Sequence, residues 1–175
     1  MARVRLYLDH PSPPVTYRFL RPGGTDSIDG LRLFAYLDLR PLMPDPANRL
    51  AVGIQKAVID TGSHLSIFRE DIWRCLDRRL VTWLPFDPAT PPGMRLLTIA
   101  GGTFPYDLGE ISAVLRDKDG NALPLTFVAK FTRDGGRLSI PTTVGLRGGV
   151  LDGRAIRGEP DPADRFGQGW WLADP

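Results

Sequence analysis

The segment AVIDTGSHLSIF, residues 57–68, places one carboxylate where it could do chemistry. Three apolar residues lead up to Asp60, which indicates the end of a strand that enters the core. A carboxylate at such a place ionises only with hydrogen-bond support, and Thr61 and Gly62 offer a hydroxyl and an unobstructed backbone N–H. The segment therefore predicts a tight turn that holds Asp60 toward a cleft. An Asx-turn that merely ends a strand is the alternative interpretation of the same residues.

The segment resembles the active-site sequence of the retropepsin-like aspartic proteases, in which apolar residues precede Asp-Thr-Gly and a small residue follows. Two later segments agree with that family in order and approximate spacing. LLTIAGGTFPYDLGEISAVL (96–115) resembles its flap hairpin, and TTVGLRGGVLDG (142–153) resembles its late segment. The resemblance covers roughly residues 33–155. It implies an all-β fold, a retropepsin-like acid-protease barrel of a single lobe with one or two short helices.

The late segment departs from the family pattern. The family reads apolar-Leu-Gly-Arg, whereas this chain reads Val144-Gly145-Leu146-Arg147, with Leu and Gly exchanged. We therefore expect different packing beneath the active-site turn, which bears on catalysis more than on the fold.

The resemblance implies an aspartic endopeptidase that acts on a peptide or protein substrate and needs no metal or organic cofactor. Two carboxylates must share one proton for this chemistry, because like charges about 3 Å apart cannot both ionise. The chain has a single Asp-Thr-Gly, so the resemblance implies a homodimer with Asp60 from each subunit, in which Thr61 hydrogen-bonds across the twofold axis. The implied site residues are Asp60 as the catalytic group; Thr61, Gly62 and Ser63 as its support; and Ile99, Ala100, Gly101 and Gly102 as the flap.

Two alternatives stay open at this point. One is a catalytically inactive retropepsin-like module that dimerises or binds peptides. The other is a monomer with an unrelated β architecture, which would not place Asp60 under a hairpin tip.

Other chemistry-bearing residues favour ordinary roles. His64 follows the turn, where adjacent side chains point apart, so we expect it on the surface. Ser63 lacks the G-x-S-x-G context of a hydrolase nucleophile. Cys75 lies on an apolar stripe, which is typical of an inert buried thiol. His10 lies in a proline-rich segment and no HExxH occurs, which argues against a zinc hydrolase.

The pattern along the chain predicts many short strands. They are expected at residues 5–8, 15–20, 31–39, 50–60, 122–131 and 138–146, with two more around Gly101-Gly102. The strands at 31–39 and 50–60 are expected to form an antiparallel pair. Helical spacing of apolar residues predicts one helix over residues 65–76. Trp170 and Trp171 are expected to cap an open end of the fold rather than to anchor a partner.

Length and composition bound the remaining possibilities. The 175 residues suggest one domain, which we divide into an N-terminal strand extension (1–30), a retropepsin-like domain (31–157) and a Pro/Gly-rich C-terminal tail (158–175). A net charge of +2 without a basic stripe argues against nucleic-acid binding. No run approaches the roughly 18 apolar residues of a membrane helix, and the first residues lack a signal-peptide core, so we expect a cytoplasmic protein.

Overall fold

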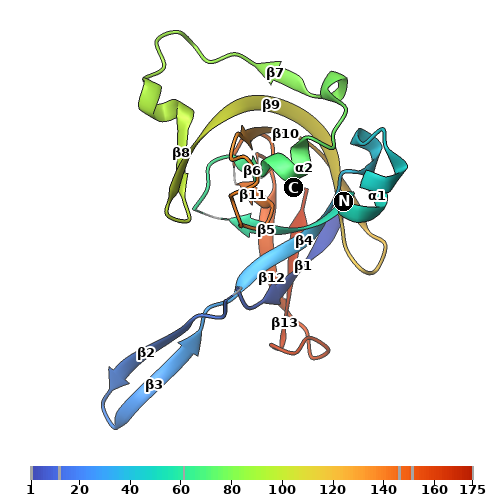
Figure 1. The fold of residues 1–175 in the computed structure, drawn as a ribbon. Coiled ribbons are helices and arrows are strands. Elements are labelled where there is room, and N and C mark those ends of the chain that lie inside the picture. The colour runs from blue at the N-terminus through green and yellow to red at the C-terminus, as the bar shows by residue number, and fades with distance from the viewer. Residues whose placement is uncertain (1, 12, 61, 146, 151, 175) are drawn as a thin grey trace.

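The computed structural model describes residues 2–174 except 12, 61, 146 and 151, and its elements are mostly strands (Figure 1). The predicted all-β class is confirmed. The strands are β1 (Arg3–Asp9), β2 (Thr16–Arg21), β3 (Gly24–Asp29), β4 (Arg32–Asp38), β5 (Ile54–Asp60), β6 (Ser66–Phe68), β7 (Thr82–Leu84), β8 (Leu96–Ile99), β9 (Gly102–Arg116), β10 (Ala122–Thr132), β11 (Thr143–Gly145), β12 (Ala155–Pro160) and β13 (Gln168–Ala173). The helices are α1 (Pro46–Val52) and α2 (Glu70–Trp73), with short 3-10 turns η1 (Arg40–Leu42), η2 (Arg78–Leu80) and η3 (Pro92–Arg95).

One sheet contains all the described strands except β2 and β3. Its order is β12-β13-β1-β4-β5-β11-β6-β10-β9-β7, and β8 pairs with β9 beside this path. Because β4 also pairs with the end of β9, the pairings from β4 through β11 and β10 return to β4. The long paired strands β9 and β10 arch over β6 and α2 (Figure 1). Stacked rings of Phe68, Phe127 and Phe131 lie at the centre of the core.

The antiparallel pairing of β4 with β5 was predicted correctly. The helix α1, which lies in the connection between the two strands, was not predicted. Leu33 pairs with Ile59 and Asp38 with Ile54 in antiparallel register. The first residues of the predicted 50–60 strand instead belong to α1, so that part of the prediction is wrong. Asp45 caps this helix by accepting a hydrogen bond from the Ala47 N–H, and proline at the first helical position fits the unpaired end.

The helix predicted over residues 65–76 is wrong in its first half. Residues 66–68 form β6, which pairs in parallel with β10 and antiparallel with β11. All three side chains are buried, which means that both faces of this strand are covered. A short apolar run of this kind does not distinguish a buried strand from a helix. Within the predicted range 65–76, only Glu70–Trp73 forms an α-helix.

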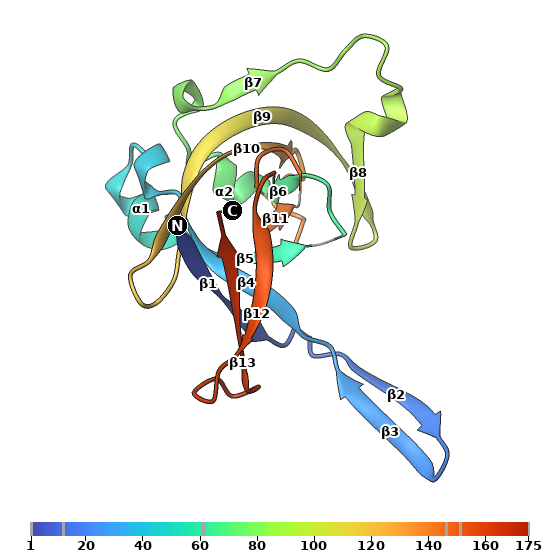
Figure 2. The same cartoon turned by 180° about the vertical axis from the view of Figure 1, so that it is seen from behind.

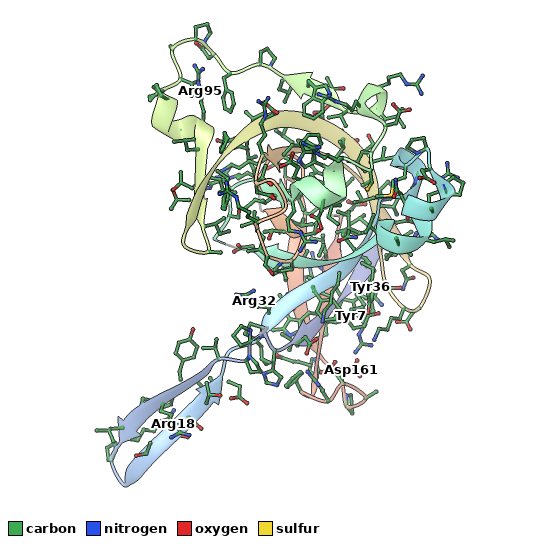
Figure 3. The ribbon with its side chains drawn as sticks, in the orientation of Figure 1. Tyr7, Arg18, Arg32, Tyr36, Arg95 and Asp161 are labelled. Carbon is green, nitrogen blue, oxygen red and sulfur yellow. The ribbon has the colours of Figure 1, made fainter. Side chains whose placement is uncertain are left out.

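Both ends of the chain contribute to the main sheet. β1 lies between β13 and β4, and β13 also pairs with β12. Residues 158–175, expected from composition to be a Pro/Gly-rich tail, thus include the end of β12 and all of β13. Tyr7 of β1 and Tyr36 of β4 lie close together where the two strands meet, with ring centroids 6.0 Å apart (Figure 3).

The strand β3 was not predicted, and with β2 it forms a separate two-stranded hairpin. Figures 1 and 2 show this hairpin projecting away from the main sheet. Among the described residues, no helix has the length and apolar character needed to cross a membrane.

A buried carboxylate at the end of β4 ties three elements together. Asp38 is 2% exposed and accepts hydrogen bonds from Arg40 Nη2 at 2.7 Å and from Arg116 Nε at 2.8 Å. The Arg40 guanidinium lowers the pKa of Asp38 to about 2; burial opposes this shift, and Arg116 adds to it. Because the folded-state pKa is depressed, the stabilisation is complete above the ordinary value of 3.8 and is lost as the pH falls through about 2.

We therefore predict that Asp38→Asn lowers the free energy of unfolding by about 2 kcal/mol at neutral pH. Urea denaturation of mutant and wild type should show this gap at neutral pH and should show it shrinking below about pH 4. Asp26→Asn is the control, because Asp26 pairs with Arg21 where both side chains are at least half exposed, and such surface pairs contribute little. An equal loss in both variants would contradict the assigned role of Asp38.

Candidate active site

Asp60 is the last residue of β5, and a tight turn follows it. The N–H of Gly62 donates to Asp60 Oδ1 at 2.9 Å, and the N–H of Ser63 donates to the Asp60 carbonyl at 3.2 Å. The predicted support from Gly62 is therefore present, whereas Thr61 lies outside the described residues. The Asp60 side chain is half-buried, so it is held by the turn yet open to a ligand.

The residues after Gly62 shape the turn. Ser63 Oγ donates to the carbonyl of Leu65 at 2.7 Å, which is a structural contact within the turn. His64 is exposed, as predicted, and its carbonyl accepts from the N–H of Arg147 at 2.8 Å. The turn after Asp60 is thus tied by backbone hydrogen bonding to the late segment of the sequence.

The strand β11 passes between β5 and β6, directly beside this turn. Val144 pairs with Ile59 and Gly145 with Asp60 in parallel register, and Thr143 pairs with Ile67 of β6. Gly145 lies so close to the turn that an added Cβ would come within 2.4 Å of the Leu65 carbonyl carbon. The glycine is therefore required at 145. Leu146, the other half of the exchange, lies outside the described residues.

The predicted flap is a hairpin with a two-residue tip. Ile99 pairs with Gly102 across the end of β8 and β9, and Ala100 and Gly101 between them have φ of 50° and 75°. Two successive positive φ values match the primed turn that suits the twist of paired strands. Gly101 fits this backbone without strain, whereas Gly102 is needed for another reason: a Cβ there would meet the Phe104 ring at 2.5 Å.

Asp60 and this hairpin tip line the same cavity. It has a volume of about 650 Å³, and its walls include Asp60, Val58, Thr143, Ile99, Ala100 and Trp170. The catalytic and flap residues proposed from sequence, Asp60 with Ile99 and Ala100, are therefore brought together from β5 and β8.

Sequence reasoning missed several walls of the cavity. Arg32 and Leu31 enter it from the start of β4, Ile140 and Pro141 from the loop before β11, and Trp170 from β13. Trp170, expected only to cap an open end of the fold, is half-buried and faces this cavity. None of these positions carries a local motif, because distant strand pairings bring them together.

A smaller cavity of about 330 Å³ adjoins the first, and the two share Arg32, Val58, Ile140 and Pro141. Lys56 and Asp9 form an ion pair at its wall, and Arg69 pairs with Asp71. Arg32 makes no ion pair within the described ranges. At the boundary between the cavities, Arg32 lies opposite Asp9 in the β1–β4 register, and Asp60 lines the larger cavity with it.

Other reactive groups lie apart from this site. The thiol of Cys75 is half-buried, and burial raises its pKa, as expected for an inert cysteine. In the part of the chain that the structure describes, His, Cys, Asp and Glu form no group of three or more that could hold a metal ion. Comparison of the chain with protein-family models, with curated proteins and with solved structures finds no match.

Proposed function

We propose that this protein is an aspartic endopeptidase with a retropepsin-like fold, which hydrolyses peptide bonds at a site formed by Asp60 of two identical subunits. The observation that carries the proposal is a cavity lined both by Asp60 and by the tip of the β8–β9 hairpin. The sequence resemblance in three segments, in matching order, gives independent support.

The chemistry needs one proton on the pair of carboxylates. The ionised Asp60 takes a proton from water while the water oxygen attacks the peptide carbonyl carbon. The protonated Asp60 of the other subunit gives its proton to the carbonyl oxygen. When the tetrahedral intermediate collapses, the C–N bond breaks and a proton passes to the leaving nitrogen.

A second requirement is a place for an extended peptide that is screened from bulk water, and the hairpin forms one side of that place. Among the described strands β8 pairs with β9 alone, so its other edge offers backbone groups to a ligand. An extended peptide between this edge and Asp60 would gain strand-like hydrogen bonds. The apolar walls contributed by Val58, Ile99 and Ile140 suit substrate side chains that are themselves apolar.

The pH dependence of peptide cleavage tests the proposal. At low pH both carboxylates are protonated and no base remains, and at high pH both are ionised and no acid remains. We expect a bell-shaped rate profile with its optimum on the acidic side of neutrality. A mixed peptide library digested across a pH series and read by mass spectrometry gives the profile. A flat profile through neutrality would contradict the aspartic dyad, and absence of cleavage at every pH would favour the inactive peptide-binding alternative.

A further inference from the structure

The projecting hairpin formed by β2 and β3 pairs with no other strand in the part of the chain that the structure describes. We call residues 15–30 the arm. Its two strands pair with each other, from Thr16 with Asp29 to Arg21 with Gly24. Figures 1 and 2 show the arm extending clear of the main sheet. A lone two-stranded hairpin is at best marginally stable in water, so this arm needs a surface to lie on.

The arm carries large apolar side chains that are exposed to solvent. In the alternating register, Tyr17, Phe19 and Ile28 share one face, on which Tyr17 is 60% and Ile28 is 61% exposed. Leu20 on the opposite face is 84% exposed. Contiguous exposed apolar side chains of this kind mark an interaction surface.

The base of the arm leads directly to the candidate active site. Leu31 and Arg32, which follow β3, line the cavity that contains Asp60. Figure 3 shows Arg32 at the start of β4 near the base and Arg18 far out on the arm. The β8–β9 hairpin lies on the same side of the molecule as the arm in both views (Figures 1 and 2). A molecule that approaches Asp60 closely therefore has the arm beside it.

We propose that the arm is a dimer clasp, which packs against the body of a second copy of this chain. This inference rests on the proposed function, since a dyad requires a second Asp60 at the mouth of this cavity. A twofold axis near Asp60 places each arm next to the other subunit, so every arm contact is made twice. The exposed parts of Tyr17, Phe19, Leu20 and Ile28 on two arms, together with the partner surface that they cover, bury an area on the order of 1,000 Å², which is the lower limit for a specific interface.

The body offers an apolar surface on the side from which the arm projects. Met94 of η3 and Leu96 of β8 are 65% and 45% exposed beside the free edge of β8. A partner's arm that lies there covers both side chains and steadies the hairpin whose tip lines the cavity of Asp60. The clasp thereby links subunit association to the geometry of the site.

The arm can be removed without opening the main sheet. The N–H of Gly30 donates to the carbonyl of Val15 at 2.8 Å, so the two ends of the arm already meet. Replacing residues 16–29 by a short glycine linker should therefore leave the rest of the fold intact. We expect the thermal unfolding midpoint of the main domain to stay near that of the wild type, while the dimer dissociation constant rises at least about 100-fold.

Two double variants distinguish the contribution of the Tyr17–Ile28 face to dimerisation from that of the opposite face of the arm. Tyr17→Ser combined with Ile28→Ser removes the apolar face and should weaken the dimer at least about tenfold. Arg18→Ser combined with Ser27→Ala changes the opposite face of the same strands and should leave association nearly unchanged. Sedimentation equilibrium over a concentration series measures all four proteins, with peptide turnover recorded on the same samples.

The outcomes separate the clasp from the proposed function. An armless protein that dimerises as tightly as the wild type overturns the clasp, and continued peptide cleavage in that sample leaves the proposed function standing. A wild-type protein that stays monomeric at every concentration overturns the clasp as well. If that monomer also cleaves no peptide, the proposed function fails with it.

Discussion

The variant Asp60→Asn should lose all measurable cleavage of every peptide that the wild-type protein cuts, while it keeps its fold and its dimer. An amide can neither take the proton from water nor give one to the carbonyl oxygen as the carboxyl does. The change is nearly isosteric, and Asn Oδ1 can still accept the hydrogen bond that the Gly62 N–H gives to Asp60. Activity should fall by at least about 1,000-fold, with the unfolding midpoint little changed.

Asp87→Asn is a matched control for this variant. Asp87 accepts a hydrogen bond from the N–H of Ala89, two residues on, in the same way that Asp60 accepts from Gly62. It lies outside the residues that line the cavity of Asp60. If the only role of Asp60 were to accept this hydrogen bond within its turn, the two variants would keep the same peptide turnover. Turnover retained in folded Asp60→Asn would rule out the proposed mechanism.

Mixing the mutant with the wild type asks whether the two carboxylates work together. If subunits exchange freely and one Asn silences a shared site, an equimolar mixture holds about a quarter of its dimers in active form. Independent sites in each subunit would leave half of the activity. The activity measured as a function of the mutant fraction therefore distinguishes a dyad on a twofold axis from a site that is complete in one chain, whatever the absolute rate.

The sequence was most informative where a residue type is required by local geometry. Asp60 and Gly62 form the predicted turn, and Ile99 with Ala100 lies at the predicted hairpin tip. Each of these features depends on a few adjacent residues. The sequence was enough to predict these features because their geometry does not depend on residues far away in the chain.

The features missed from sequence depend on distant partners. Residues 66–68 read as a helix because apolar spacing alone does not reveal that β10 and β11 flank them. Trp170 reaches the cavity only because β13 pairs with β1, and Arg32 because β4 pairs with β5. The β3 strand carries mostly small and polar residues, so its sequence lacks the apolar alternation from which strands are read.

The exchange of Leu and Gly in the late segment leads to a prediction about stability. Gly145 pairs with Asp60 and donates its N–H to Ser66 Oγ at 3.2 Å, at the point where β11 passes beneath the turn. A Cβ at this position would lie 2.4 Å from the Leu65 carbonyl carbon and 2.6 Å from its oxygen. These are backbone atoms of the turn that follows Asp60, so they cannot rotate away as a side chain would.

We expect Gly145→Ala to lower the free energy of unfolding by about 1–3 kcal/mol, because the turn must move or β11 must separate from β5. Activity should fall further than stability does, since any shift of the turn displaces Asp60 relative to the hairpin tip. Gly93→Ala is the control: Gly93 is exposed in η3, and no atom lies within 4 Å of the place its Cβ would take. Urea denaturation and peptide turnover of both variants measure the two effects separately. A Gly145→Ala protein as stable and as active as Gly93→Ala would show that the turn tolerates the added methyl, and the close approach of β11 to residues 62–65 would then not be what positions Asp60.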